Sequence, residues 1–394
     1  MRKLRLAILF DSHLPTHGGS FSLINSIVEG FRQTSESDEL QIELVSVGRS
    51  KNFFASQHFS PENRVFKFIR KRLSSNSLRI RAYWQTRSKL ARFLLKNNFD
   101  IVYFLGVEAE VTSVPFVVTV WDLQHRTHPW FPEVGNEKAW HGREEYYKRI
   151  LPRAIGVITG TQRGKDEIRG FYGVDEKNIF IIPHVISEVF DNTLAVVSNR
   201  LTGPYIYPAQ FWAHKNHHLI VEAVRILRDK HGKQIHVDFI GSDKGNLDHI
   251  ESLILDFELS DQIKILGFVS DETKSKLYSE SKGLIYASFS GPENLPPLEA
   301  FKFGIPVLYP DFPGAREQLE DLPFYFDPSS PFSLVQAINQ LENLSPADFT
   351  NKLDAQKELL KDKRPSDYSL EFTKTIFKIS GMLRSWDIND FSKY

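Results

Sequence analysis

Residues 288–310, SFSGPENLPPLEAFKFGIPVLYP, constrain the fold of this chain more than any other segment. An apolar run over residues 283–288 breaks into a loop, and the helix that follows carries Pro296 and Pro297 in its first turn. Proline is tolerated there because its φ is already helical and its missing N–H would have no partner. Gly304 ends the helix, and a second apolar run begins just after it. This order of strand, loop, helix and strand predicts an α/β domain.

The start of this helix is a candidate anion site. A helix N-terminus beyond a strand's carboxyl end favours negative charge, because its unpaired N–H groups and its dipole are positive. The two prolines remove two donors, which leaves the amides of Asn294, Leu295 and the loop. Glu299 lies one turn further on, where a carboxylate can accept two hydrogen bonds from a vicinal diol such as ribose. The alternative is that Glu299 only complements the helix dipole.

Strands and helices alternate along the rest of the chain. Apolar runs in the first half predict strands over residues 4–10, 41–47, 100–105, 114–120, 155–159 and 179–183, and helices over 20–32 and 137–153. The second half has predicted strands over 235–241, 261–266, 283–288, 307–309 and 324–326, and helices up to 228, from 332, from 347 and over 368–386. Such alternation predicts parallel, doubly wound sheets. We expect a first domain over residues 1–185, a linker over 186–201, a second domain over 202–365 and a final segment over 366–394.

Composition excludes several classes of protein. The chain has 394 residues, enough for two domains of ordinary size, and 41% of them are hydrophobic, which is typical of globular rather than disordered chains. It has no cysteine, so disulfides and thiolate metal sites are excluded. No apolar run reaches the length of a membrane span, and the N-terminal MRKLR leads into a short strand rather than a signal peptide. We therefore expect a cytoplasmic protein.

Positive charge gathers in one segment although the 49 basic and 49 acidic residues balance over the whole chain. From Arg49 to Lys96 there are 13 lysines and arginines and a single acid, Glu62. The segment predicts peripheral contact with an anionic surface, such as the inner face of a membrane or a lipid-linked phosphate. The alternative is a solvated helical face, since the segment lacks a clean apolar stripe. No nucleic-acid-binding motif accompanies the charge, so nucleic acid is not an expected partner.

The segment GPENLPPLEAFKFGIPVL, followed by PGAREQLED, resembles the nucleotide-sugar loop and helix of family-4 retaining glycosyltransferases. The resemblance implies the GT-B fold, in which two Rossmann-like domains face each other across a cleft and the last helix crosses back to the first domain. It also implies that Glu299, the second glutamate of a two-glutamate motif, binds the ribose. Gly291 stands at the position of the first glutamate, and Glu293 lies two residues later. The chain therefore departs from the family at Gly291, where the resemblance implies a contact with the donor sugar.

Two further segments match the nucleotide site of the family. Gly18 and Gly19, at the turn after the first strand, match the glycine loop that faces the donor phosphates, although a tight turn would equally explain paired glycines. Lys215 matches the lysine of a phosphate-binding segment, and a lysine just before a helix can place its charge over a phosphate. Gln210 stands where that segment usually has arginine. A separate loop, Phe268 and Val269 after a predicted strand, matches the one that lodges the base.

The segment WDLQHRTH after the predicted strand 114–120 also departs from the family pattern. The family usually has His-Asp at this position, with the histidine close to the donor sugar. Here Trp121 replaces the histidine and Asp122 is kept. We expect His125 or Arg126 to supply the missing polar contact. The alternative is that His125 braces the loop and Trp121 belongs to the core.

Together these features predict a retaining glycosyltransferase that moves a hexosyl-type sugar from a nucleotide-diphosphate-sugar to a hydroxyl of a glycan or lipid-linked saccharide, as in cell-surface polysaccharide biosynthesis. The catalytic candidates are Lys215, His125 and Asp122, and we expect no metal and no cofactor. Retention comes from the resemblance alone. Two alternatives stay open at this point. One is a nucleotide-sugar epimerase of the same architecture. The other is a non-catalytic nucleotide-sugar-binding subunit, which the departures at Gly291, Gln210 and Trp121 favour.

Overall fold

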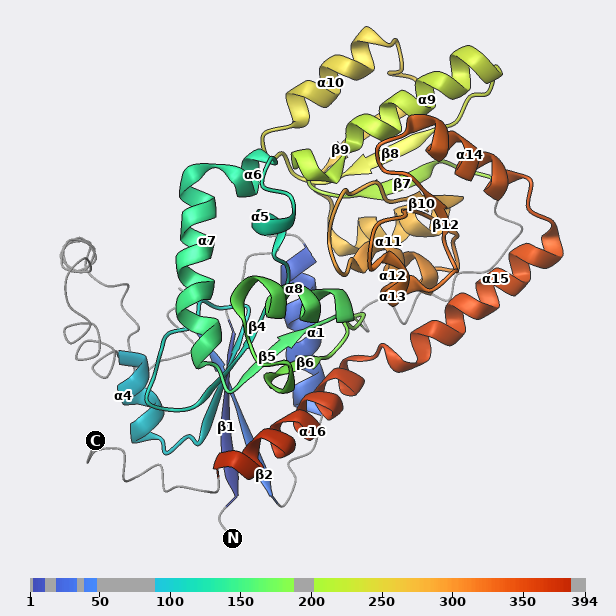
Figure 1. Ribbon diagram of the computed structural model, residues 1–394. Coiled ribbons are helices and arrows are strands. Elements are labelled where there is room, and N and C mark those ends of the chain that lie inside the picture. Colours follow the sequence, from blue (N-terminus) through green and yellow to red (C-terminus); the bar gives the residue numbers. More distant parts are fainter. Residues whose placement is uncertain (1–2, 11–18, 34–38, 48–88, 188–201, 384–394) are drawn as a thin grey trace.

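The computed structural model describes residues 3–10, 19–33, 39–47, 89–187 and 202–383 (Figure 1). Within these residues the strands form two parallel sheets of six strands each, and helices cover both faces of each sheet. The expected two-domain α/β architecture with doubly wound parallel sheets is confirmed. Gly18 and most of the basic segment from Arg49 to Lys96 lie outside the described residues, so the predictions made for them stay predictions.

The first sheet has the strand order β2-β1-β3-β4-β5-β6. Its strands are β1 (Leu4–Phe10), β2 (Leu40–Ser46), β3 (Ile101–Leu105), β4 (Phe116–Thr119), β5 (Gly156–Thr159) and β6 (Ile179–Ile181). The central strand β3 is buried over its whole length, as expected for a parallel sheet that is covered on both faces. Its helices are α1 (Gly19–Gln33), α4 (Lys89–Lys96), α5 (Gln124–Thr127), α6 (Pro132–Gly135), α7 (Glu137–Ile150) and α8 (Gln162–Tyr172).

The second sheet has the order β12-β11-β10-β7-β8-β9, so the direction of strand addition reverses between β7 and β10. Its strands are β7 (Tyr205–Pro208), β8 (Val237–Ile240), β9 (Ile263–Gly267), β10 (Gly283–Ile285), β11 (Val307–Pro310) and β12 (Phe324–Phe326). Its helices are the 3₁₀ turn η5 (Ala213–Lys215), α9 (His217–His231), α10 (Leu247–Asp256), α11 (Asp271–Glu280), α12 (Leu295–Lys302), α13 (Ala315–Leu319), α14 (Pro331–Glu342) and α15 (Pro346–Leu359). This is the strand order of a Rossmann fold, in which ligands bind at the reversal point.

The last helix, α16 (Pro365–Leu383), leaves the second domain and packs on α1 of the first (Figure 1). Phe372 and Ile376 are fully buried in the core of the first domain. The Tyr368 hydroxyl lies 2.8 Å from that of Tyr103 on β3. Gly30 allows this close approach, since a Cβ atom there would lie 2.0 Å from the carbonyl oxygen of Pro365. The expected return of the final helix to the first domain is confirmed.

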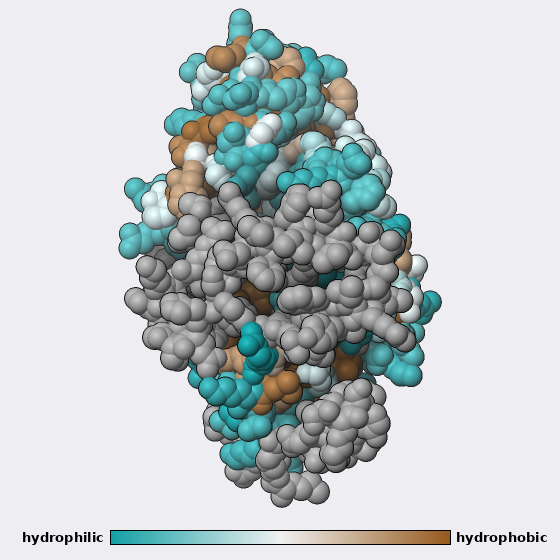
Figure 2. Space-filling view, turned by 90° about the vertical axis from the view of Figure 1, so that its left-hand side faces the viewer, coloured by the Kyte–Doolittle hydropathy of each residue, from teal (hydrophilic) through white to brown (hydrophobic). Residues whose placement is uncertain are grey.

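The surface mixes polar and apolar residues. On the face shown in Figure 2, hydrophilic residues cover much of the upper, second domain, with smaller hydrophobic areas between them. Within the described residues, no helix combines the length and the apolar character needed to cross a bilayer.

Candidate functional site

The carboxyl ends of the two sheets face each other, because segments that follow their strands make contact. Glu293, after β10, contacts His184, after β6. Glu317, after β11, accepts hydrogen bonds from the main-chain N–H groups of the first turn of α8, which follows β5. Ligands of open α/β sheets bind at these edges. The candidate site therefore lies between the two sheets.

Lys215 lies at the reversal point of the second sheet. Its Nζ donates a hydrogen bond of 2.9 Å to the hydroxyl of Tyr286, which follows β10. The Tyr286 hydroxyl donates to Oδ1 of Asn294 at 2.6 Å, and Nδ2 of Asn294 donates to the Tyr309 hydroxyl at 2.7 Å. A chain of hydrogen bonds thus runs from the ammonium group across the ends of β10 and β11. Tyr286 has no signature of its own in the sequence, because it lies within an apolar run.

Two carboxylates of the first domain lie near the ammonium group of Lys215. Burial lowers the pKa of Lys215 to about 8, and the carboxylates of Asp122 and Glu133 oppose that shift. Both acids belong to the first domain, after β4 and on α6 respectively. At neutral pH the lysine is therefore mostly protonated, and its charge interacts with these two carboxylates of the first domain.

Asp122 is fixed by its own domain. Its Oδ1 accepts a hydrogen bond of 2.6 Å from Arg143 and one of 2.9 Å from the Gln124 N–H. Burial raises the pKa of Asp122, but the Arg143 charge and the Gln124 amide outweigh it, so the pKa lies below its usual value. Trp121 is half-buried against the first core, and its ring centroid lies 5.5 Å from that of His184.

In this structure His125 and Arg126 both contact Glu144, and their expected contact with a donor sugar stays a prediction. His125 is 0% exposed, and its Nε2 lies 3.2 Å from Oε1 of Glu144 and 3.1 Å from the Tyr172 hydroxyl. Arg126 donates to the same Oε1 at 2.6 Å and to Oε2 as well. The cause is Glu144, a nearly buried carboxylate that needs donors. His125 braces the loop, which was the alternative.

The start of α12 differs from the expected anion site. The N–H of Asn294 donates to Oε1 of Gln318 at 2.9 Å, so this amide is already paired within the second domain. Leu295 is half-buried against the core of the first domain. The two prolines lie in the first turn of α12, as predicted. The expectation that the Asn294 amide binds an anion stays a prediction, and an anion there would have to replace Gln318 as the acceptor.

Glu293 forms a contact between the domains in this structure, and its expected contact with the donor stays a prediction. Its side chain is 3% exposed, its Oε1 accepts a 2.7 Å hydrogen bond from the His184 N–H, and its Oε2 lies 3.3 Å from Nε2 of the same histidine. It fills the space beside Gly160, where a Cβ atom would lie 1.2 Å from Oε2. Gly291 has φ +132°, and a Cβ there would lie 2.7 Å from Oδ1 of Asn294. The absence of the first family glutamate therefore has a local steric reason.

The other predicted residues lie on α12 and in the loop after β9. Glu299 is nearly buried, and it accepts hydrogen bonds of 2.9 Å from Nζ of Lys274 and 2.9 Å from the Tyr278 hydroxyl. Phe268, in the loop after β9, is 54% exposed, while its neighbour Val269 packs on the core of the second domain.

Two residues of the predicted phosphate site, Gln210 and Gly19, lie in different domains. Gln210, after β7, donates to the hydroxyl of Ser242 at 3.2 Å and accepts from the Trp212 indole at 3.2 Å. Gly19 is the first residue of α1, so it stands at the carboxyl edge of the first sheet. Glu299, Phe268, Lys215 and Gly19 stay the candidates for nucleotide contacts.

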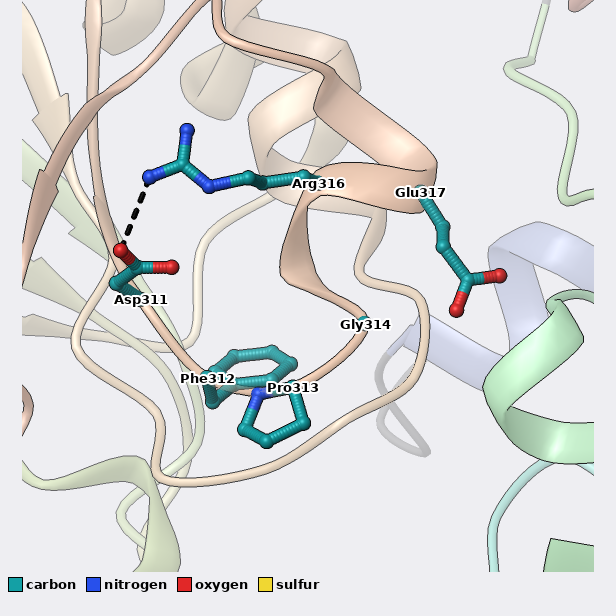
Figure 3. A pocket seen from close by; sticks show the side chains of 6 residues that line it. All are labelled: Asp311, Phe312, Pro313, Gly314, Arg316 and Glu317. Atoms are coloured by element: carbon teal, nitrogen blue, oxygen red, sulfur yellow. Dashed lines mark hydrogen bonds and ion pairs between the residues drawn. The ribbon is translucent and has the colours of Figure 1, made fainter. Parts of the chain in front are cut away.

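A hollow of about 450 Å³ lies beside the contact between the domains (Figure 3). It is lined by Asp311, Phe312, Pro313, Gly314, Arg316 and Glu317. In Figure 3 the Arg316 side chain points to Asp311, with which it forms an ion pair of 2.9 Å, whereas Glu317 points the other way. Oε2 and Oε1 of Glu317 accept from the Gln162 and Arg163 N–H groups at 2.6 and 3.0 Å. A carboxylate of the second domain thus binds the N–H groups at the start of α8.

Glu293 should make the contact between the domains sensitive to pH. Burial raises the pKa of Glu293 from 4.5 to about 7. Below pH 4.5 the carboxyl group is protonated in folded and unfolded chains alike, and between pH 4.5 and 7 only the unfolded chain releases the proton. Its contribution to stability is therefore full at low pH and is lost as the pH rises, by up to about 3 kcal/mol. Burial lowers the pKa of His184 from 6.5 to about 3. Between these values only the unfolded chain binds the proton, so the contribution of His184 to stability is lost as the pH falls below 6.5.

The Glu293→Gln variant isolates the first effect, because glutamine does not titrate. We expect the variant to gain stability relative to the wild type as the pH rises from 5 to 8, measured by urea unfolding at each pH. Glu145→Gln, on the exposed face of α7, controls for the loss of one carboxylate. Parallel stability curves for wild type and Glu293→Gln would contradict the assignment.

Two family models match this chain. Residues 36–188 match the model described as Glycosyltransferase Family 4, and residues 203–358 match the one described as Glycosyl transferases group 1. The first match covers most of the first domain, and the second covers most of the second domain.

Two bacterial proteins are similar in sequence over part of the chain. O-antigen chain mannosyltransferase RfbU from Salmonella typhimurium is 26% identical over 203 residues, which are 51% of this chain and 54% of that protein. Serotype-specific mannosyltransferase WbdA from Escherichia coli is 27% identical over 152 residues, 38% of this chain and 18% of that protein. The matches therefore span about half of the first relative and less than a fifth of the second.

Solved structures share the fold over almost the whole chain. A glycosyltransferase from Rickettsia africae superposes with a TM-score of 0.65 at 16% identity and covers 98% of this chain and 100% of its own. HepE from Anabaena, solved in complex with UDP and glucose, superposes with a TM-score of 0.64 at 16% identity and covers 95% and 100%. At such identities the likeness shows the arrangement of the two domains.

Proposed function

Because this chain belongs to the family-4 glycosyltransferases with the GT-B fold, we propose that it transfers a hexosyl unit from a nucleotide-diphosphate-sugar to a hydroxyl of a glycan or lipid-linked saccharide. The similarity to two mannosyltransferases, one of them for O-antigen chains, supports mannose as the first sugar to test and a cell-surface polysaccharide as the acceptor. The complex of HepE with UDP supports a nucleoside diphosphate as the leaving group. We also propose that transfer proceeds with retention, as the family resemblance implies, at the cytoplasmic face of a membrane.

The position of Lys215 is the observation that supports this proposal most directly. Its ammonium group lies at the reversal point of the second sheet and faces the acids of the first domain. Breaking a bond between a sugar and a diphosphate develops negative charge on the leaving phosphates. A preorganised positive charge that is aimed at those phosphates stabilises the transition state more than the ground state. Closure of the two domains would keep water away and so favour transfer over hydrolysis.

We propose that different residues bind the diphosphate, the ribose, the base and the sugar of the donor. The diphosphate would lie between Lys215 and the start of α1 at Gly19. The ribose would contact Glu299, and the base would stack on the exposed ring of Phe268, because an aromatic face can cover any base. Asp122, fixed by Arg143, would face the sugar from the first domain.

A two-step experiment tests the proposal. Titration calorimetry with UDP, GDP and ADP should show that one of them binds. The matching nucleotide-sugar should then release that nucleoside diphosphate when a polysaccharide or lipid-linked acceptor is added. We expect EDTA to leave the rate unchanged, since Lys215 and main-chain donors are proposed to carry the charge. Conversion of the donor sugar without an acceptor, followed by NMR, would instead indicate an epimerase. Donor binding with no turnover over a broad panel of acceptors would indicate a binding subunit.

A further inference from the structure

Glu133 of the first domain contacts the phosphate-binding segment of the second. Glu133 lies in the first turn of α6, and its side chain is 7% exposed. Its Oε1 accepts a 3.0 Å hydrogen bond from the main-chain N–H of His214 and a second one from Nδ1 of the same residue. His214 is the neighbour of Lys215 in η5. A carboxylate from one domain thus occupies two donors of the other.

The second domain holds these donors in place by itself. The carbonyl oxygen of His214 accepts from the Phe289 N–H at 2.9 Å, and the carbonyl oxygen of Lys215 accepts from the Tyr207 hydroxyl. Because these bonds come from β7 and from the segment after β10, the His214 N–H points outward from a fixed turn. The donors therefore exist whether or not Glu133 is present.

The carboxylate of Glu133 is only partly satisfied where it lies. Among the partners found within the described residues, its Oε2 has none, although this atom is buried. A buried carboxylate with one unpaired oxygen is costly, and its negative charge is balanced here by the nearby ammonium of Lys215. Carboxylate and phosphate oxygens are both acceptors that such a pair of N–H groups and a cation can bind.

Resting on the proposed function, we propose that Glu133 occupies the place of a phosphate oxygen of the donor in the donor-free enzyme, and that the diphosphate displaces it. Donor binding then breaks the contact between Glu133 on α6 and His214 in η5. The apparent affinity for the donor is reduced by the fraction of molecules in which Glu133 fills the site. The competitor is part of the chain, so its effect is present at any protein concentration.

The test is titration calorimetry of the full chain with UDP, GDP, ADP, inorganic pyrophosphate and the corresponding nucleosides. Glu133→Gln should tighten binding of the preferred diphosphate by about tenfold, and that of pyrophosphate by the same factor, because both gain the donors that the carboxylate held. Nucleosides without phosphate should bind as to the wild type. Glu133→Ala, which removes the competing oxygens completely, should tighten binding at least as much. Glu137→Gln, an exposed glutamate on the adjacent α7, is the matched control and should change nothing.

Several results would overturn the inference. Weaker binding to Glu133→Gln would show that Glu133 helps to hold the donor, and unchanged binding would show that it does not compete. An equal gain for nucleosides would show that the variant opens the domains and does not vacate a phosphate position. If no diphosphate binds to the wild type or to either variant, the proposed function fails and this inference fails with it. Thermal unfolding of each variant confirms that it is folded.

Discussion

Replacing Lys215 by alanine is expected to lower kcat by about 10²–10³-fold while changing the KM for the donor much less. The reason is that negative charge on the diphosphate grows as the bond to the sugar breaks, so the ammonium group acts mainly on the transition state. The position of the ammonium group depends on its hydrogen bond of 2.9 Å to Tyr286 and on the turn η5 that contains Lys215. Initial rates with the donor and acceptor found by the titrations above measure the effect.

The control for this variant is Lys244→Ala. Lys244 is an exposed lysine after β8, and its ammonium lies over the ring of Trp212 at 5.8 Å. This variant removes the same charge from the same domain, at the end of the neighbouring strand β8. A kcat of Lys215→Ala within a factor of about three of the wild type would contradict the proposed role, since a single such group is worth far more than that.

The pH profile gives an independent check on Lys215. Burial lowers its pKa to about 8, so the free enzyme loses the positive charge as the pH rises through that value. We therefore expect kcat/KM, which reports on the free enzyme, to fall above about pH 8. Lys215→Ala should lack this decrease.

Local patterns predicted the elements well. The strand predicted over 4–10 is β1 (Leu4–Phe10), and the proline pair and Gly304 mark α12 (Leu295–Lys302) within two residues. These features depend on neighbours in the sequence: the fixed φ of proline, the freedom of glycine and the period of apolar residues. The sequence alone therefore predicts the fold and the edge of the sheet at which a ligand would bind.

The contacts of polar side chains across the fold were not predictable in the same way. His125 was a reasonable candidate by position, but its environment depends on Glu144 on α7, a residue that no local pattern connects with it. The role of Glu293 depends on Gly160 and His184 in the other domain. A carboxylate that binds main-chain N–H groups of a distant segment has no signature in its own neighbourhood. Glu133 was missed for the same reason.

Replacing Glu299 by glutamine should weaken binding of the preferred nucleoside diphosphate by about 10–100-fold, as expected for loss of a charged acceptor worth roughly 1.5–3 kcal/mol. Lys274 and Tyr278 each donate to one oxygen of Glu299, which leaves each oxygen one further lone pair for a ribose hydroxyl. Glutamine keeps the size of the side chain, so the pocket should stay filled. Titration calorimetry measures the change, and the kcat should change less than the affinity.

A comparison of ligands separates this role from the alternative, in which Glu299 only complements the dipole of α12. The 2′,3′-dideoxy form of the preferred diphosphate lacks the diol, so it should bind the wild type more weakly and should bind wild type and Glu299→Gln with nearly equal affinity. Inorganic pyrophosphate, which has no ribose, should not distinguish the two proteins either. The interaction energy of this double-mutant cycle then belongs to the contact between the diol and the carboxylate. If the dideoxy form and pyrophosphate lose as much affinity for Glu299→Gln as the full diphosphate does, Glu299 acts through the helix or the fold, and the ribose lies elsewhere.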